Sequence, residues 1–337
     1  MLTLRMPPDL VRIVRRDRAD ESAGPDRVAG IAERMAALLT AGLAPATAWA
    51  ALAAPTDGGD RPTRPDPGRD ADSALVAHAA RAASDGASVA DAVDAARASN
   101  GAAAPAWAVL AAAWAVADAS GAPLARCLTM LAATLRDEAQ LRREAAALLA
   151  GPAASARLVA ALPLIAVAFG ALLGFDTLGV LLGGPIGLAC LLVGSTLLWC
   201  GARWNRALIR RAAVAHPAAG LELELLAMAL SSGASVARAR QIVEHAMARH
   251  LPGSAAPGEA ASVVGLAERA GSPVADLLRA EANRIRGAAR AEGAARAATL
   301  GVRLMLPLGC CVLPAFVLLG VAPLMISVVT GTLGGAV

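Results

Sequence analysis

Histidine, cysteine and carboxylate side chains are the groups of this sequence that could bind a metal or move a proton. The chain has four His and five Cys among 337 residues. After Glu244-His245, the next histidine, His250, follows five residues later, which puts it off the helix face that a pair of zinc ligands shares. No Cys-x-x-Cys pair occurs, and isolated thiols in apolar surroundings typically pack as small, buried hydrophobic side chains. The sequence therefore predicts no metal site and no redox centre.

Motifs for nucleotide and acyl chemistry are also missing. The sequence contains no Lys and no Gly-x-x-x-x-Gly-Lys-Ser/Thr loop, which excludes a P-loop ATPase. It has no Gly-x-Ser-x-Gly nucleophile motif. The carboxylates of Asp137 with Glu138, and of Glu222 with Glu224, have the spacing of solvated helix faces or of a surface that meets a basic partner. We expect no catalytic residue and no cofactor, so the chain is not predicted to be an enzyme.

Arginine supplies all the basic side chains, and the formal net charge is +4. The Arg-rich stretch 279–296 could attract a polyanion. It lacks the aromatic residues on which nucleic-acid bases stack, and anionic lipid headgroups are the better match. We therefore expect a lipid bilayer, and no nucleic acid, among the partners.

Composition indicates an all-α membrane protein. Hydrophobic residues make up 57% of the chain, aromatic residues only 2%, and Tyr is absent. Ala, Leu, Arg and Glu favour helices, and the β-branched and aromatic enrichment typical of sheets is missing.

Three long runs without a charged residue predict membrane-spanning helices at 157–174, 178–200 and 304–330. As helices, their uncharged cores would reach roughly 26, 35 and over 40 Å, against about 30 Å of hydrocarbon. Small-residue spacings such as Gly183 and Gly187 predict close helix packing in these spans. Ion-coupled transporters usually carry ionisable groups inside their spans. A transporter or channel subunit is therefore the alternative reading of function, not the leading one.

The placement of arginines predicts the orientation of the spans, because basic residues flank spans on the cytoplasmic side. Arginines precede the first and third spans and follow the second, whereas the short link 175–177 holds only one charge, Asp176. We expect the N-terminus and both large helical segments in the cytoplasm, and the C-terminus outside the cytoplasmic membrane. The residues predicted at the membrane interface are Arg157, Trp199, Arg203, Trp204, Arg206 and Arg303.

An internal repeat organises the rest of the chain. Residues 117–128, ADASGAPLARCL, match residues 267–278, AERAGSPVADLL. In each, a helix ends at a Gly suited to the left-handed C′ conformation, and a new helix starts after a Pro or small polar residue. The predicted turn and hinge residues are Gly42, Gly86, Gly121, Pro123, Gly233, Gly271 and Pro273, with Pro163 and Pro307 opening the first and third spans.

The repeat divides the chain into domains. We expect a basic N-terminal tail at 1–25, a first helical bundle at 26–150 and a second at 206–300. In the tail, Leu10, Ile13 and Val14 could form a short membrane-grazing face, but a solvated tail is favoured. Residues 56–72, rich in Pro, Gly and charge, are expected to form a surface loop or disordered insert in the first bundle.

With its repeated bundles, each running through an Arg-containing helix into a Leu-Pro span, the chain resembles the type II secretion system F family over roughly residues 27–330. The C-terminal VRLMLPLGCCVLPAFVLLGVAPLMISVV is most similar to the tight-adherence branch. The resemblance implies an inner-membrane platform protein that couples a separate cytoplasmic secretion ATPase to the extrusion of a pilin or pseudopilin. It also implies other platform subunits as partners, in a homo- or hetero-oligomer.

Overall fold

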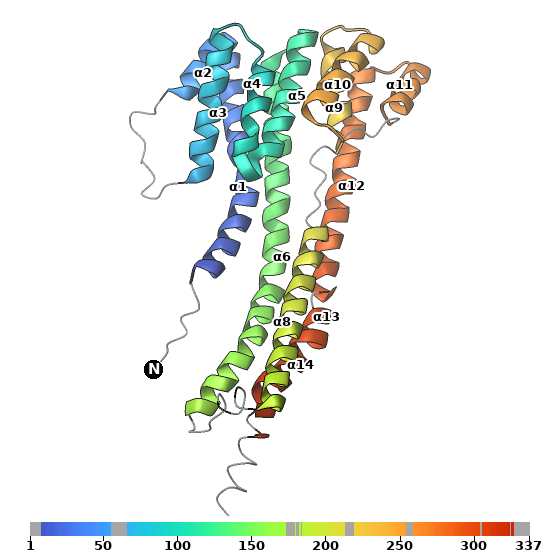
Figure 1. The fold of residues 1–337 in the computed structure, drawn as a ribbon. Helices are drawn as coiled ribbons and strands as arrows, with labels where there is room; N and C mark the ends of the chain where they lie inside the picture. Colours follow the sequence, from blue (N-terminus) through green and yellow to red (C-terminus); the bar gives the residue numbers. More distant parts are fainter. Residues whose placement is uncertain are drawn as a thin grey trace, which may run out of the picture. The chain divides into compact units, whose positions relative to one another are not determined.

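The structure, a computed structural model, describes residues 8–54, 66–172, 179, 182, 184–212, 219–253, 259–303, 305–323 and 325–326. The described residues contain helices and turns and no strand, which confirms the all-α prediction for this part of the chain (Figure 1). The helices are α1 (Pro8–Thr40), α2 (Pro45–Ala53), α3 (Pro67–Ser84), α4 (Val89–Ala96), η1 (Arg97–Ala103), α5 (Ala104–Ser120), α6 (Leu124–Leu172), α8 (Pro185–Ala212), α9 (Leu221–Ser231), α10 (Val236–His250), α11 (Glu259–Ala270), α12 (Val274–Arg303), α13 (Met305–Pro307), η2 (Leu308–Val312), α14 (Leu313–Phe316) and η3 (Val317–Val321).

The chain forms two compact units. The first, which we call the bundle unit, combines Met1–Arg143 with His216–Ala291, and the second, the span unit, combines Glu144–Ala215 with Glu292–Val337. Most of each segment expected as a bundle thus lies in the bundle unit, around one hydrophobic core that draws on both. Residues 144–150, 206–215 and 292–300 of the expected bundles fall in the span unit.

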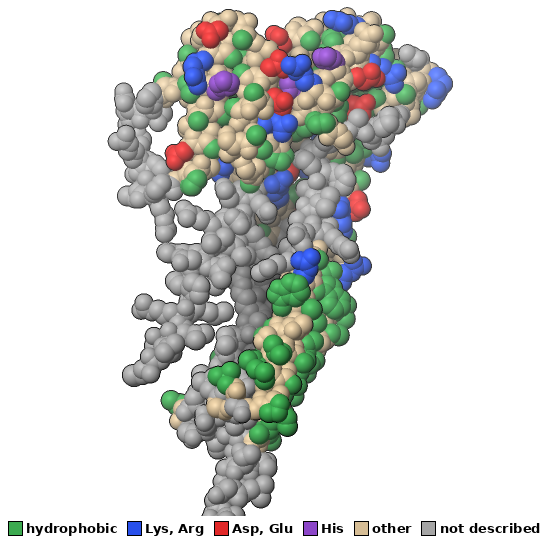
Figure 2. Space-filling view, viewed as in Figure 1, with side chains coloured by type: hydrophobic (Ala, Val, Ile, Leu, Met, Phe, Trp, Pro, Cys, Tyr) green, Lys and Arg blue, Asp and Glu red, His purple; other side chains and the backbone are tan. Residues whose placement is uncertain are grey.

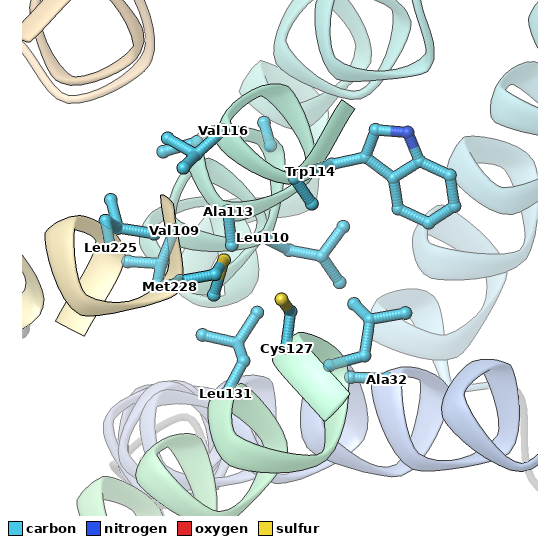
Figure 3. Close-up of a cluster of buried hydrophobic side chains, with 14 of the residues drawn as sticks. Ala32, Val109, Leu110, Ala113, Trp114, Val116, Cys127, Leu131, Leu225 and Met228 are labelled. Carbon is cyan, nitrogen blue, oxygen red and sulfur yellow. The ribbon is translucent and has the colours of Figure 1, made fainter. Parts of the chain in front are cut away.

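Helix α5 lies at the centre of the bundle unit and contacts α1, α4, α9 and α10. Almost every residue from Ala106 to Ala117 is buried, because the helix is apolar around its whole circumference. Figure 3 shows side chains of α5, α6 and α9 meeting in this core, among them Leu110, Cys127 and Leu225. Burial raises the pKa of the Cys127 thiol to about 11, so the thiol stays protonated and packs as an apolar group.

Two boundaries of the bundle unit differ from the sequence prediction. Residues 8–25, expected as part of a basic tail, belong to helix α1, and Gly24 is buried against the backbone of Ala102 and Ala103. Residues 67–72, expected in a surface loop, form the first turns of α3, where Pro67 occupies the first turn and the Asp66 carboxylate accepts a hydrogen bond from the Gly68 amide. The remainder of the predicted insert, 56–65, lies outside the described residues.

The span unit packs α8 against the helical segments that follow Met305. Gly187, Gly194 and Gly201 recur every seven residues in α8 and are buried. A Cβ on Gly194 would lie 2.5 Å from Cγ of Leu319, and one on Gly201 would lie 3.0 Å from Cβ of Cys311. These glycines therefore let two apolar helices approach closely, as small residues do in membranes.

Three helical stretches are long and apolar enough to cross a membrane by length and composition: Val89–Ser120, Pro185–Asn205 and Val274–Val321. The first is 67% buried within its most apolar part, because it contains the central core helix of the bundle unit, and we assign it to that core. The second is only 17% buried, and apolar side chains cover this part of the surface in Figure 2.

Apart from Gly184, which forms a bend, the described residues of the predicted spans are helical. The first, 157–174, falls in α6, whose described side chains Ile165, Phe169 and Leu172 are exposed and apolar. The second and third fall mainly on α8 and on residues 305–323, while 173–174, 178, 180–181, 183, 304, 324 and 327–330 lie outside the described residues.

Candidate functional site

The predicted turns lie between consecutive helices of the bundle unit. All five turn glycines, Gly42, Gly86, Gly121, Gly233 and Gly271, have positive φ values, between 64° and 90°. A residue with a Cβ is strained in this conformation, so the backbone itself requires glycine at these points.

The turns at Gly121 and Gly271 have the same hydrogen bonds. After Gly121, the Ala122 amide donates to the Ala117 carbonyl at 3.1 Å, and after Gly271 the Ser272 amide donates to the Ala267 carbonyl at 3.2 Å. This six-to-one bond is the mark of a Schellman motif. The carbonyls of Pro123 and Pro273 then each accept two amides from the first turn of the next helix. The match in sequence is therefore also a match in backbone structure.

We call the elements from α1 to α6 the first repeat and those from α9 to α12 the second repeat. Each of these turns opens a long helix that an ion pair connects to the first helix of its own repeat. Arg136 of α6 pairs with Glu33 of α1. In the second repeat, Nη2 of Arg286 in α12 lies 2.9 Å from Oε2 of Glu224 in α9. Each Arg follows its turn glycine, Gly121 or Gly271, by fifteen residues, and each Glu precedes Gly42 or Gly233 by nine. We call these two contacts the twin ion pairs.

The twin ion pairs differ in burial. The side chains of Glu224 and Arg286 are 9% and 16% exposed, whereas those of Glu33 and Arg136 are 36% and 54% exposed. The Oε1 atom of Glu224 is buried without a hydrogen-bond partner among the described residues. One further pair, Arg290 of α12 with Asp137 of α6, joins the two long helices within the bundle unit.

A buried carboxylate holds the first repeat together. Asp72 of α3 is 3% exposed and accepts hydrogen bonds from Nε of Arg27 at 2.6 Å, Nδ2 of Asn100 at 2.9 Å and Nε1 of Trp107 at 2.8 Å. These donors come from α1, η1 and α5, so a single side chain ties four elements together. Sequence reasoning missed this residue, because it placed Asp72 in a loop.

The histidines of α10 line a cleft of about 490 Å³ between α4, α5 and α10. Arg249 closes one side through a 2.7 Å contact of its Nε with Oδ1 of Asp91. His250 is almost fully buried there, and its Nδ1 has no hydrogen-bond partner among the described residues. Among the described residues no cluster of His, Cys, Asp and Glu could hold a metal ion.

We expect the bundle unit to lose stability as the pH falls below about 6.5, the ordinary pKa of a histidine. Burial lowers the pKa of His250, and the nearby Asp94 and Asp91 only partly oppose this. The unfolded chain therefore binds a proton at a higher pH than the folded chain does, which favours unfolding on acidification. Denaturation curves of the wild type and His250→Gln at pH 7.5 and 5.5 measure the difference. An equal loss in both proteins would assign the effect to other groups.

The predicted interface residues that the structure describes lie near the ends of the apolar helices of the span unit. The guanidinium of Arg203 lies 5.8 Å from the ring centre of Trp199, a cation–π contact, and Trp199, Trp204 and Arg303 are exposed. Pro307 is buried beside α8, where its carbonyl faces Gly201. Pro163 and Arg157 lie within α6 and Arg206 within α8, and their side chains are outside the described set.

Replacing Gly194 by Leu is expected to destabilise the span unit by about 1–3 kcal/mol, the usual cost of overpacking. The new side chain would have to displace Leu319. The matched control is Gly309→Leu, since Gly309 is exposed with nothing within 4 Å of an added Cβ. Thermal unfolding in detergent, followed by Trp fluorescence, compares the two variants. Equal melting temperatures would contradict the close packing of these helices.

Comparison with known proteins gives one family match and no match among curated proteins or solved structures. The family model described as type II secretion system (T2SS), protein F, matches residues 31–171. This range covers the first repeat, including the turns at Gly42, Gly86 and Gly121 and the ion pair of Glu33 with Arg136, and it continues along α6 to its apolar end. Over residues 31–171, a little under half of its length, the chain is similar to the type II secretion system protein F family.

Proposed function

We propose that this chain is the inner-membrane platform protein of a type II secretion or tight-adherence pilus machine. In this role it couples a separate cytoplasmic ATPase to the extrusion of a pilin or pseudopilin. The observation that carries the proposal is the family match over 31–171, a range that ends in the apolar part of α6. The sequence has no nucleotide-binding motif of its own, so work on a pilin would have to come from a partner's ATP hydrolysis.

The twin ion pairs support the bundle unit as the part that responds to the ATPase. Each connects the first helix of a repeat to the long helix that leads toward apolar sequence. A force that the ATPase exerts on α1 or α9 would therefore be transmitted to α6 or α12 through a direct ion pair. In this proposal the turns at Gly121 and Gly271, with Pro123 and Pro273, are the hinge points, and Pro163 and Pro307 are the points at which the spans bend.

We propose the orientation that the arginines indicate, with the N-terminus and bundle unit in the cytoplasm and the C-terminus outside. Alkaline phosphatase fused after Val337 is expected to be active, because the enzyme folds only in an oxidising compartment. The same reporter fused after Gly253, in the turn that follows α10, is the inactive control. The opposite pattern of activities would overturn this orientation.

The coupling proposal is tested by co-purification from detergent-solubilised native membranes after cross-linking, with mass spectrometry of the proteins that are recovered. We expect a secretion-type ATPase and a pilin or pseudopilin. Recovery of a small-molecule permease component, with neither of the expected partners, would overturn the proposal and favour a transporter subunit.

Variants at Gly121 and Gly271 test the hinge role. Val is strained at positive φ, whereas Asn tolerates this conformation, so Gly→Asn is the matched control for Gly→Val. We expect the double Val variant to lose pilin or cargo export and the double Asn variant to retain most of it. Export that is equal in both variants, at equal protein levels in the membrane, would remove these turns from the mechanism.

A further inference from the structure

Among the described residues, the helix packing between the two repeats of the bundle unit runs in one direction. Helix α5 of the first repeat packs against α9 and α10 of the second. In the repeat, α11 corresponds to α5, while α1 and α2 correspond to α9 and α10. Within the described residues, α11 makes no comparable contact with α1 or α2. The arrangement is therefore head to tail and not two-fold. The α5 side of the first repeat and the α9–α10 side of the second are in contact. The equivalent faces, on α11 of the second repeat and on α1 and α2 of the first, are unused.

The unused counterpart on the second repeat has an exposed apolar residue where the first repeat has a buried one. Val116 and Leu266 each precede their turn glycine by five residues. Val116 is fully buried, on the side of α5 where Leu225 of α9 lies (Figure 3). Leu266 is 51% exposed, and it is the one large hydrophobic residue of the bundle unit found exposed among the described residues.

Charges replace apolar contacts at the other equivalent positions. Leu131 and Leu225 line the same small cavity between the repeats. Their counterparts are Glu281 on the unused face of α12 and Arg34 on the unused face of α1, which carry opposite charges. Thr134 and Glu224, which are polar and charged, also line that cavity.

The counterparts of Thr134 and Glu224 are Arg284 and Glu33, again an opposite pair. If one repeat face met the other as it does inside the chain, both pairs would be complementary. Fully buried positions support this register, since Leu128 matches Leu278 and Ala132 matches Ala282.

We propose that a second copy of this chain docks its α1–α2 face onto the α11–α12 face, repeating between chains the contact that the repeats make within one chain. Leu266 supplies the apolar anchor. Glu281 and Arg284 bind each other within α12 at 2.6 Å, and Glu33 binds Arg136. The docked copies would extend these pairs into networks, in which Glu281 also meets Arg34 and Arg284 also meets Glu33 of the other copy. A heterologous contact of this kind closes into a ring or continues as a filament. The inference rests on the repeat and the exposed face, and it does not depend on the ATPase or the pilin.

The test is made on the full chain in native membranes. Copies with Arg34→Cys and one tag are co-expressed with copies that carry Glu281→Cys and a second tag, and disulfide formation is induced with a mild oxidant. We expect a disulfide between differently tagged chains, and none when only the natural cysteines are present. Cross-linking of Arg34→Cys copies to each other would show a two-fold contact and overturn the proposal, as would cross-linking only to a different protein.

Charge reversal in purified chains gives an independent measurement. Arg34→Glu or Glu281→Arg is expected to weaken self-association at least about tenfold by sedimentation in detergent, because like charges then face each other. The double reversal is expected to restore association, and Leu266→Asp to abolish it. Arg81→Glu, at an exposed residue of α3 that is not among the proposed contacts, is the matched control. A wild type that sediments as a monomer, or single reversals without effect, would overturn the proposal.

Discussion

Replacing Asp72 by Ala is expected to lower the free energy of unfolding by about 3–5 kcal/mol, the usual effect of removing one partner from a buried charge pair. The change leaves the Arg27 guanidinium, which is 15% exposed, without its carboxylate. It also leaves the buried Asn100 amide and Trp107 indole N–H without their acceptor. Each unpaired buried donor adds a desolvation penalty.

Chemical denaturation of the detergent-solubilised chain, followed by fluorescence of the buried Trp residues, measures this loss. The matched control is Asp70→Ala, since Asp70 lies in the same first turns of α3 but is exposed, and its loss should cost about 0.5 kcal/mol or less. If both variants unfold at the same denaturant concentration, Asp72 does not hold the four elements together.

Replacing Glu224 by Ala is expected to cost about 3 kcal/mol, because Arg286 would keep its charge in a largely buried position. The repeat supplies its own control. Glu33→Ala removes the equivalent contact with Arg136, but there both side chains are more than a third exposed, so about 1 kcal/mol or less is expected.

The ratio of these two losses is the informative quantity. Denaturation midpoints of the two variants, measured at low and at high salt, should show a large loss for Glu224 that salt hardly changes. They should show a small loss for Glu33 that salt reduces further. Equal losses would mean that burial does not distinguish the twin ion pairs.

The turns were predictable from sequence because their requirement is local. A left-handed backbone at Gly121 or Gly271 depends on one residue and its two or three neighbours, and such a signature can be read without knowing the fold. The all-helical class and the apolar spans were predictable for a similar reason, since composition and run length do not depend on distant contacts.

Long-range contacts were not predictable in this way. Asp72 lies in a run of Pro, Gly and charged residues, and that composition favoured a loop. The hydrogen-bond donors that surround the Asp72 carboxylate lie 28 to 45 residues away in the sequence. The small-residue signal in the spans was likewise read with a four-residue spacing, as at Gly183 and Gly187. Gly183 lies outside the described residues, so that spacing stays a prediction. The close contacts that the structure describes involve Gly194 and Gly201, seven residues apart, which face the C-terminal helical segments.

The unequal burial of the twin ion pairs has a consequence for how such a chain changes over evolutionary time. Both pairs occupy equivalent positions in the repeat, so an ancestral duplication would have given them the same constraints. Enclosure of Glu224 and Arg286 now makes most single replacements there costly, while replacements at Glu33 or Arg136 cost little. Among descendants of one ancestral sequence, we therefore expect Glu224 and Arg286 to be kept together or replaced together. Glu33 and Arg136 are expected to be replaced one at a time.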